Sequence, residues 1–508
     1  MIRSFVHLAR LLSWGRTLAR HGALREIETS PHAPAALRRL ARLARFGTGA
    51  PAEPRYAEAF EALGPAAIKL GQALATRPDL VGPDAARDLL RLQDNLPPAP
   101  FASVRRAIEE AFGAPVETLF ASIEEVPVGA ASIAQVHRAT TSDGRDVAVK
   151  VLRPGIEADF ARAIETYEWA AARIERLGGE AARLRPRATI AYFRRWVDRE
   201  LNLRMEAASA SELAAELTAE AGFVVPDVDW ARTSRRVLTT DWVGGIKLTD
   251  LAAVDAAGID RKALAGVLVR GFLRQAIAGG FFHADLHQGN LFALADGRLA
   301  VVDFGIMGRI NRQARLWLAE ILYGLLTGNY RRVAEIHFEA QYVPAHHNIA
   351  EFETALRSVG EPIRGLAVKD ISIGNMLDGL FSITRQFDME TQPHLLLLQK
   401  TMVMVEGVAL SLDPDVNMWD LAGPFIRDWM RDELGPEALV AGRLIDTVRA
   451  LRRLPDLVQR LDAMVPSPGA APPLPPLAPL PERGPRRLAW LMLGIGLGVG
   501  LGWTLSGF

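Results

Sequence analysis

The sequence predicts an α+β fold of two lobes, preceded by an N-terminal helical extension and followed by a C-terminal transmembrane helix. Three observations carry this prediction. Residues 132–151 have the pattern of two strands joined by a turn, residues 246–465 show mainly helical periodicity, and residues 488–508 contain no charged side chain. The chain has 508 residues, enough for two or three folded units.

The composition excludes several classes of protein. With 49% hydrophobic and 23% charged residues, the chain can bury a core, which excludes wholesale disorder. Basic and acidic residues balance at 59 each, so no basic field indicates a nucleic-acid partner. The absence of cysteine excludes disulfides and cysteine-ligated metals. Only six basic residues are lysine, so each lysine is a candidate functional residue.

The chain divides into six predicted segments. In order, they are a basic N-terminal segment (1–50), a helical extension (51–123), an N-lobe (124–243), a helical C-lobe (244–465), a proline-rich linker (466–487) and a transmembrane helix (488–508).

The N-terminal segment is predicted to form a basic amphipathic helix. Residues 1–50 carry nine arginines against two glutamates, and arginines alternate with apolar side chains over residues 3–20. This pattern is typical of a helix lying on anionic lipid. The alternative is a solvated basic helix packed on the main body of the protein.

The first candidate nucleotide-binding segment is residues 124–154. Lys150 ends the second strand of its predicted hairpin, and a loop of small residues comes before the first strand. The loop residues are Val128, Gly129, Ala130, Ala131 and Ser132. Kinases cover nucleotide phosphates with such a loop and grip them with such a lysine. Aliphatic strands ending in lysine are also common elsewhere, so this segment alone does not establish a site.

The second candidate segment, residues 279–308, carries the catalytic and metal-binding residues. His283, Asp285 and Asn290 have the spacing of a kinase catalytic loop, and Asp303 begins an Asp-Phe-Gly triplet. Asp285 is expected to accept a proton from the attacking hydroxyl group. Asn290 and Asp303 are expected to bind magnesium, because a predicted hairpin at 291–303 brings them together. A structural role is the expectation for His283.

The helix predicted over residues 194–217 supplies a carboxylate for Lys150. Glu206 is the preferred partner, and Glu200 is the competing candidate. Six residues on a helix correspond to about 600° of rotation, which leaves the two about 120° apart and argues against a shared role. Further along, Thr240–Gly245 has the position of an adenine-binding hinge, with backbone groups at Asp241 and Val243 contacting the base.

The C-terminal run is predicted to be a membrane anchor. Its 21 uncharged residues can cross a hydrocarbon core of about 30 Å as a helix. Arginines at 483, 486 and 487 place the preceding chain on the cytoplasmic side. Gly494, Gly498 and Gly502 share one helix face, a candidate surface for a homodimer. We therefore expect a single-pass protein of the inner (cytoplasmic) membrane.

Together these residues resemble the UbiB-like atypical kinases, a family associated with ubiquinone biosynthesis. The distinctive segment is 63–98, in which Lys69, Gly71 and Gln72 fit the family's lysine-x-glycine-glutamine motif. The resemblance implies an atypical protein-kinase-like two-lobed fold that uses ATP (or ADP) and Mg²⁺. It also implies that Lys69 and Gln72 reach into the active-site cleft, where a peptide would otherwise lie.

The chain departs from the family pattern at a few positions. Gly129 replaces the usual leading alanine of the small-residue loop, which leaves the preference between ATP and ADP open. Asn202 stands where the family commonly has an acidic residue, and Leu286 and Gln288 replace prolines. The chain also has one clear membrane span where many members have two.

The resulting hypothesis is a membrane-anchored, ATP- and magnesium-dependent atypical kinase or ATPase that supports ubiquinone biosynthesis. Its expected partners are membrane lipid, prenylated quinone precursors and the enzymes that act on them. Protein kinase activity is the weaker interpretation, because no Ala-Pro-Glu triplet follows the Asp303 segment. The alternatives are a lipid-binding scaffold switched by nucleotide and a small-molecule kinase.

Overall fold

The computed structural model describes residues 2–29, 35–49, 51, 53–75, 81–92, 97–176, 185–217, 222–364, 383, 386–389 and 393–434. The linker and the transmembrane helix predicted for 466–508 lie outside these residues. The described chain forms two compact units. The first contains Met1–Ala207 and Val228–Trp242, and the second contains Ala208–Asp227 and the described residues from Val243 onward.

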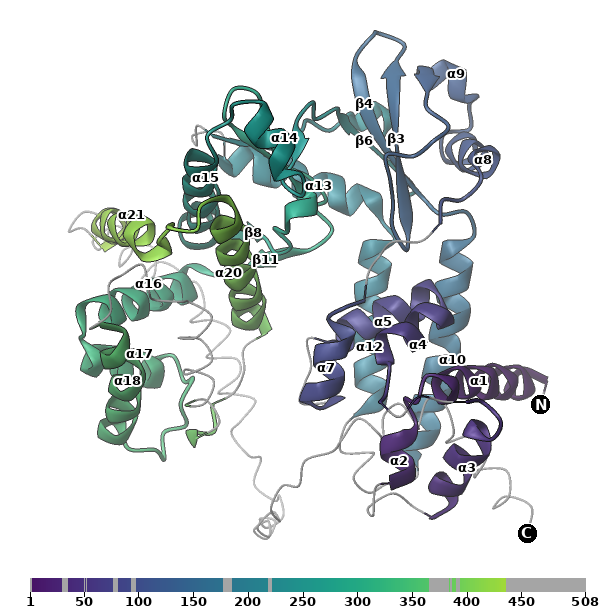
Figure 1. Ribbon diagram of the computed structural model, residues 1–508, viewed down its shortest axis with the longest axis horizontal. Coiled ribbons are helices and arrows are strands. Elements are labelled where there is room, and N and C mark those ends of the chain that lie inside the picture. The colour runs from purple at the N-terminus through teal and green to yellow at the C-terminus, as the bar shows by residue number, and fades with distance from the viewer. Residues whose placement is uncertain are drawn as a thin grey trace, which may run out of the picture. The chain divides into compact units, whose positions relative to one another are not determined.

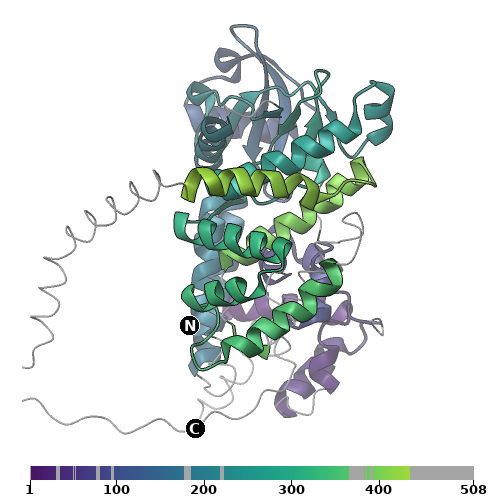
Figure 2. The ribbon, with the colours of Figure 1, turned by 90° about the vertical axis from the view of Figure 1, so that its left-hand side faces the viewer.

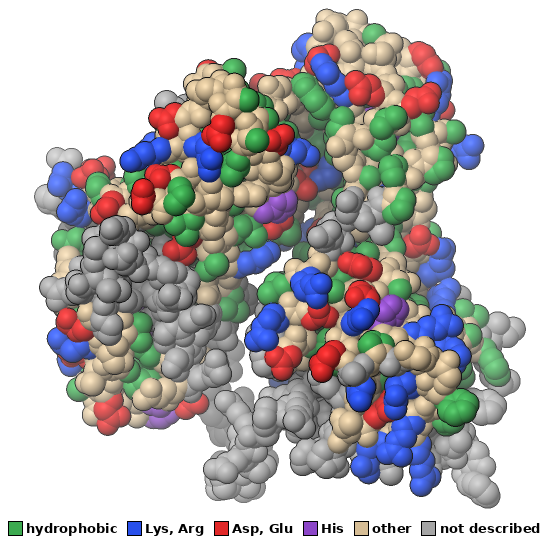
Figure 3. Space-filling view, in the orientation of Figure 1, with side chains coloured by type: hydrophobic (Ala, Val, Ile, Leu, Met, Phe, Trp, Pro, Cys, Tyr) green, Lys and Arg blue, Asp and Glu red, His purple; other side chains and the backbone are tan. Residues whose placement is uncertain are grey.

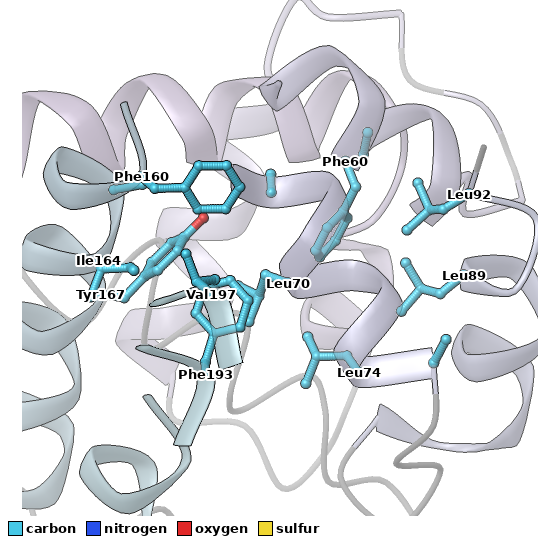
Figure 4. Packing of buried hydrophobic residues seen from close by; sticks show 14 of the residues in the cluster. Phe60, Leu70, Leu74, Leu89, Leu92, Phe160, Ile164, Tyr167, Phe193 and Val197 are labelled. Atoms are coloured by element: carbon cyan, nitrogen blue, oxygen red, sulfur yellow. The ribbon is translucent and has the colours of Figure 1, made fainter. Parts of the chain in front are cut away.

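The first unit begins with helices that surround one hydrophobic core (Figure 1). They are α1 (Ile2–Arg20), α2 (Arg25–Thr29), α3 (Ala35–Arg45), α4 (Tyr56–Leu63), α5 (Pro65–Ala75) and α7 (Pro83–Leu89), followed after the first four strands of a sheet by α10 (Ile156–Arg176) and α12 (Pro186–Glu200). Figure 4 shows Phe60 and Leu74 facing Leu89 of α7 and Leu92 just after it, and Phe193 and Val197 of α12 packing beside Tyr167. The predicted helical extension is therefore tied to the long helices α10 and α12.

Helix α1 packs along one face on the body of the first unit, the arrangement given as the alternative for the N-terminal segment. Leu11 and Leu18 are fully buried in the core of the first unit, so one face of the helix packs on the body. Phe5 and Leu12 remain exposed. A helix that leaves large apolar side chains exposed beside arginines keeps a surface suited to lipid.

A five-stranded antiparallel sheet follows in the same unit, with the order β1-β3-β4-β6 and β2 paired to β3. The strands are β1 (Phe120–Ile123), β2 (Gly129–Ala130), β3 (Ala134–Thr141), β4 (Asp146–Leu152) and β6 (Val237–Asp241), with α8 (Phe101–Phe112) and α9 (Val116–Leu119) before them and the 3₁₀ turn η1 (Trp230–Arg232) before β6. The predicted hairpin is present as β3 and β4. Strand β1 was missed, because only four residues of weak alternation mark it.

The second unit is mainly helical. Its helices are α14 (Leu251–Ala256), α15 (Arg261–Leu273), α16 (Arg312–Thr327), α17 (Tyr330–Glu339), α18 (Ile349–Arg364), α20 (Pro393–Leu412) and α21 (Met418–Leu434), and α13 (Leu203–Leu217) runs into it from the first unit. Figures 1 and 2 show α16, α17 and α18 side by side, and a separate hydrophobic cluster joins them. Asp260 caps α15 by accepting from the Ala263 N–H, and Asn311 caps α16 in the same way.

Short strands of the second unit frame the predicted catalytic segment. They are β5 (Phe223–Val224), β7 (Ile246–Lys247), β8 (Phe281–His283), β9 (Leu291–Ala293), β10 (Leu299–Val301) and β11 (Met307–Arg309), with the π-helical turn η2 (Arg274–Gly279) before β8 and the 3₁₀ turn η3 (Gln288–Asn290) before β9. Strands β9 and β10 form the predicted hairpin, and β8 pairs with β11. Helices and sheets thus mix in both units, which confirms the predicted α+β class.

Among the described residues, one helix is long and apolar enough to cross a membrane. It is Leu395–Leu412 of α20, with a mean hydropathy of 1.6. Its Thr401 hydroxyl is buried and donates to the Ala284 carbonyl oxygen (3.3 Å), and the helix packs on α15. Helix α20 therefore forms part of the core of the second unit.

Candidate nucleotide-binding and catalytic site

Lys150 occupies the middle of β4 and contacts its predicted partner. Val147, Val149 and Val151 are buried against α8, so alternation along the strand turns Lys150 to the opposite face of the sheet. There its Nζ donates to Glu206, 2.7 Å from Oε1 and 3.0 Å from Oε2. Glu206 lies in the first turn of α13 and is buried. The structure thus brings together the lysine and the glutamate that phosphate binding requires.

The competing carboxylate, Glu200, binds a different lysine. Glu200 Oε2 lies 3.4 Å from Lys69 Nζ, and the two side chains are only 8% and 7% exposed. The centroid of the Trp196 ring lies 5.9 Å from Lys69 Nζ. The family motif residue Lys69 and the sheet lysine Lys150 are therefore each paired with one carboxylate of the predicted helical region.

The prediction of one continuous helix over 194–217 is wrong. Helix α12 ends at Glu200 and α13 begins at Leu203, where the backbone N–H of Leu203 donates to the Arg235 carbonyl oxygen (2.9 Å). Helical propensity continues through the break, and a tertiary hydrogen bond overrides it. Asn202 lies in the break and has a buried side-chain oxygen without a hydrogen-bond partner among the described residues.

The glycine of the family motif is required by packing. A Cβ at Gly71 would lie 2.4 Å from Leu92 Cδ1 and 2.7 Å from Phe60 Cδ1. Helix α5 can therefore approach these two side chains only because residue 71 is a glycine. Gln72 follows on α5 and is half-buried. The roles of Lys69 and Gln72 in a substrate cleft stay a prediction.

The small-residue loop is tied to the sheet. Gly129 and Ala130 form β2, and Gly129 lies opposite Val136 of β3. Ser132 is fully buried, whereas Val128 is exposed. Arg153, which sequence reasoning missed, donates from Nε to the Ala131 carbonyl oxygen at 2.7 Å and so holds the loop. Its position just after the strand that carries Lys150 was the available signal.

The hinge candidates lie on either side of a unit boundary. Asp241 is the last residue of β6, opposite Val147, and its carboxylate accepts from Arg145 Nη1 (3.2 Å). Trp242 is the last residue of the first unit, and Val243 is the first of the following stretch of the second. Contact of these backbone groups with adenine stays a prediction.

His283 holds the predicted catalytic loop from within. It is fully buried, and its Nε2 donates to the Asp303 carbonyl oxygen at 2.8 Å, while its Nδ1 accepts from the Asp285 N–H at 3.1 Å. Burial lowers the pKa of His283, against the opposing charges of Asp303 and Asp285. The imidazole therefore stays neutral and links the two aspartate-bearing segments, in agreement with the structural role expected for it.

The two predicted metal ligands are brought together by the β9–β10 hairpin. The Val302 N–H donates to the Asn290 carbonyl oxygen at 3.0 Å, which sets Asn290 beside the residue before Asp303. Asn290 is buried, and its amide nitrogen donates to the Asp285 carbonyl oxygen (3.1 Å), so its amide oxygen is the atom left for a cation. Asp303 adopts a φ of +68°, a costly conformation for a residue other than glycine. Amide and carboxylate oxygens of this kind fit Mg²⁺.

A lysine that sequence reasoning missed lies beside Asp285. Lys400 Nζ, on α20, is 3.6 Å from Asp285 Oδ1, and both side chains are partly exposed. Gln288 of the same loop donates to the Ser411 hydroxyl at the far end of α20 (2.7 Å). Helix α20 thus contacts the loop near its middle, at Lys400, and at its C-terminal end, at Ser411. The scarcity of lysine was the one sequence signal for Lys400, since more than 100 residues separate it from the loop.

Comparison with known proteins agrees with this geometry. Residues 91–337 match the ABC1 atypical kinase-like domain, and residues 356–417 match the UbiB helical domain. The chain is 41% identical over 386 residues to proteins named probable protein kinase UbiB from Marinobacter nauticus and Aeromonas salmonicida, covering 75% of this chain and 71% of each relative. A solved structure of Rv3197 with erythromycin, from Mycobacterium tuberculosis, is similar at 24% identity and a TM-score of 0.49, over 64% of this chain and 83% of that one. The domain match confirms the predicted kinase-like fold.

Proposed function

The chain belongs to the ABC1/UbiB family of atypical kinases, and on this premise we propose that it is an ATP- and magnesium-dependent kinase or ATPase of the membrane that supports ubiquinone biosynthesis. The observation that carries the proposal is the complete set of phosphoryl-transfer groups. The first unit supplies the Lys150–Glu206 pair, and the second supplies Asp285 with the two metal ligands.

Each group has a distinct task in this proposal. Glu206 orients Lys150, whose ammonium binds the α- and β-phosphates of ATP or ADP. Asn290 and Asp303 hold Mg²⁺, which neutralises charge on the phosphates. Asp285 orients the attacking hydroxyl group or water and accepts its proton. Retention of Asp285 together with both metal ligands favours turnover over nucleotide binding alone.

Lys400 serves this site as a second positive charge. Its Nζ lies 3.6 Å from Asp285 Oδ1, beside the carboxylate that would accept the proton. It can also interact with phosphate oxygens that gain charge during transfer. The Thr401 hydrogen bond holds the neighbouring backbone of α20 near the loop. The backbone position of Lys400 is therefore set by the fold.

We also propose that the protein acts at a membrane, through the anchor predicted at 488–508 and a surface on α1 and α3. This surface carries exposed apolar side chains next to exposed arginines. They are Phe5, Leu12, Leu43 and Phe46, with Arg16, Arg20, Arg39 and Arg42. Figure 3 shows basic side chains gathered over the N-terminal helices. Such a surface favours anionic lipid.

Two other functions remain candidates. A scaffold that uses nucleotide only as a switch would present prenylated intermediates to soluble enzymes without transferring phosphate. A small-molecule kinase would share Asp285 and the metal ligands, but it would have no use for the Lys69–Glu200 pair. The buried state of that pair and the fit of Gly71 to its neighbours favour a family-specific role for the segment.

The proposal is tested by ATP hydrolysis with the full-length protein and magnesium. Rates are compared in anionic and in neutral liposomes, each with and without a prenylated phenol. Hydrolysis that rises with anionic lipid or with the phenol, and that Asp303→Asn abolishes, supports a membrane-coupled ATPase. Nucleotide binding without hydrolysis under every condition would favour the switched scaffold instead.

A further inference from the structure

We propose that His346, His347 and Asp388 form a zinc-binding site in the second unit, separate from the magnesium ligands. The three residues come from two segments, the connection between α17 and α18 and the residues that precede α20. Their candidate ligand atoms, imidazole nitrogens and a carboxylate oxygen, all lie within 4.8 Å of one another.

The two histidines are presented by a fixed turn. The His347 N–H donates to the Pro344 carbonyl oxygen at 3.1 Å, and the next residue, Asn348, accepts from the Ala350 N–H with its side chain at 2.8 Å. Helix α18 begins immediately afterwards. The two imidazole rings lie side by side, with their centroids 4.2 Å apart. The turn therefore fixes the backbone that presents the two rings, of which His346 is exposed and His347 partly buried.

A buried aromatic ring positions the third ligand. Phe387 packs in the hydrophobic cluster of α17 and α18, where it lies 4.9 Å from Phe352 between ring centroids. The His347 ring packs against the same phenylalanine at 5.3 Å. Asp388 comes directly after Phe387 and adopts a φ of +48°, which costs a residue other than glycine about 1 kcal/mol or more. A carboxylate held in such a conformation next to two imidazoles suggests that a ligand offsets the cost.

The orphaned nitrogen of His347 points to a cation. Its Nε2 is shielded from solvent and has no hydrogen-bond partner among the described residues, although Asp388 Oδ2 lies 3.4 Å away. Leaving a buried polar atom unsatisfied costs about 1–3 kcal/mol. An ion between this nitrogen and the carboxylate would satisfy both. A simple ion pair between a protonated His347 and Asp388 is the rival explanation, and it gives His346 no role.

The chemical identity of the ligand atoms indicates which metal would bind. Two imidazole nitrogens and one carboxylate oxygen suit Zn²⁺, whereas Mg²⁺ prefers oxygen ligands alone. Zinc would complete its tetrahedral coordination with water. Bound there, it would join two segments about 40 residues apart in the chain and stabilise the unit, because binding to a site absent from the unfolded chain adds to folding free energy.

The test is zinc binding to the full-length protein, stripped with a chelator and then measured by competition with a chromophoric chelator in millimolar magnesium. Excess magnesium is present to occupy the oxygen ligands at Asn290 and Asp303. The variant Asp303→Asn tests whether zinc binding is independent of these ligands. The variants are His346→Ala, His347→Ala and Asp388→Asn, with His21→Ala as a matched loss of a histidine outside the site. Thermal unfolding verifies that each variant is folded.

We expect one zinc ion per wild-type chain, a higher unfolding temperature with zinc, and affinity reduced about tenfold or more in each of the three site variants. His21→Ala and Asp303→Asn should bind zinc as the wild type does. Equal affinity in His346→Ala and the wild type would overturn the site and leave the His347–Asp388 ion pair. Absence of zinc binding to the folded wild type would also overturn it.

Discussion

Lys400 Nζ lies 3.6 Å from Asp285 Oδ1, although the two residues are far apart in the chain. A helix of the C-terminal domain thereby brings a positive charge to the predicted catalytic carboxylate. Packing of α20 on α15 and β11, with the buried Thr401 hydroxyl 3.3 Å from the Ala284 carbonyl oxygen, sets this approach. The contact links the UbiB helical domain to the kinase-like domain, since the two residues lie in the segments matched to each.

Replacing Lys400 should impair turnover more than nucleotide binding. We expect Lys400→Ala to lower kcat about tenfold, which corresponds to ~1.4 kcal/mol of activation free energy, with little change in KM for ATP. The measurement is steady-state ATP hydrolysis over a range of ATP concentrations, which separates kcat from KM.

Two further variants make the Lys400 result interpretable. Lys400→Arg keeps the positive charge and should retain more activity than Lys400→Ala. Lys262→Ala removes an exposed lysine from α15 and should behave as the wild type. A Lys400→Ala protein with wild-type kcat would show that the contact is incidental.

The buried Lys69–Glu200 pair should be tolerated when intact and destabilising when one partner is removed. Lys69→Met leaves Glu200 buried without its partner, which typically costs about 3–5 kcal/mol of unfolding free energy. In Lys69→Met/Glu200→Gln no charge remains, so most of the stability should return. Denaturant unfolding of the single and double variants measures this recovery.

ATP hydrolysis by the double variant distinguishes a structural role of Lys69 from a functional one. If Lys69 acts on the nucleotide or substrate, the double variant should be stable and still deficient in hydrolysis. A stable double variant with normal hydrolysis would instead limit Lys69 to a structural role.

Gly71→Ala tests the packing explanation for the motif glycine. The added methyl group would overlap Leu92 and Phe60, and overpacking of this kind costs about 1–3 kcal/mol. Gly407→Ala is the matched control, because Gly407 lies in α20 with no heavy atom within 4 Å of an added Cβ. That change should leave stability equal or improve it by up to ~1 kcal/mol. Equal melting temperatures for Gly71→Ala and the wild type would contradict the packing explanation.

Stability should fall as the pH drops below the ordinary histidine pKa of 6.5. Burial lowers the pKa of His137, His283 and His337, so these side chains stay neutral in the folded protein. The unfolded chain binds more protons below about pH 6.5, and each such histidine then removes up to ~1.4 kcal/mol per pH unit. Above about pH 7.5 these three histidines should no longer make the free energy of unfolding depend on pH.

Urea unfolding between pH 7.5 and 5.5 measures this slope. His337→Gln removes one titrating group far from the predicted catalytic loop in sequence, and it should make the slope shallower. An unchanged slope in that variant would show that other groups dominate the acid sensitivity.

Local sequence patterns were sufficient to predict the β3–β4 and β9–β10 hairpins and the pairing of Lys150 with Glu206. The pattern of residues 146–151 predicts the strand that carries Lys150, and the pattern of residues 291–303 predicts the hairpin that joins Asn290 and Asp303, the two predicted metal ligands. Both depend on contacts between residues near in sequence. The choice of Glu206 over Glu200 agrees with the observed contact, although the helix is broken between them.

Contacts between distant segments could not be predicted. Nothing in the local pattern connects Lys400 to Asp285, or Arg153 to the backbone of Ala131, because both contacts depend on how packed elements meet. The break after Glu200 depends on a hydrogen bond to Arg235, which the helical propensity of the segment does not reveal. His346, His347 and Asp388 likewise approach one another only through the packing of Phe387.

The most direct test of the central claim is magnesium-dependent nucleotide binding by the full-length protein. Thermal unfolding is followed with ATP alone, with magnesium alone and with both, in the wild type and in Asp303→Asn. We predict a clear rise in unfolding temperature for the wild type only when both are present, and loss of that rise in Asp303→Asn. An equal rise in the variant would contradict the assignment of Asp303 to magnesium, and no rise in a folded wild type would contradict nucleotide binding itself.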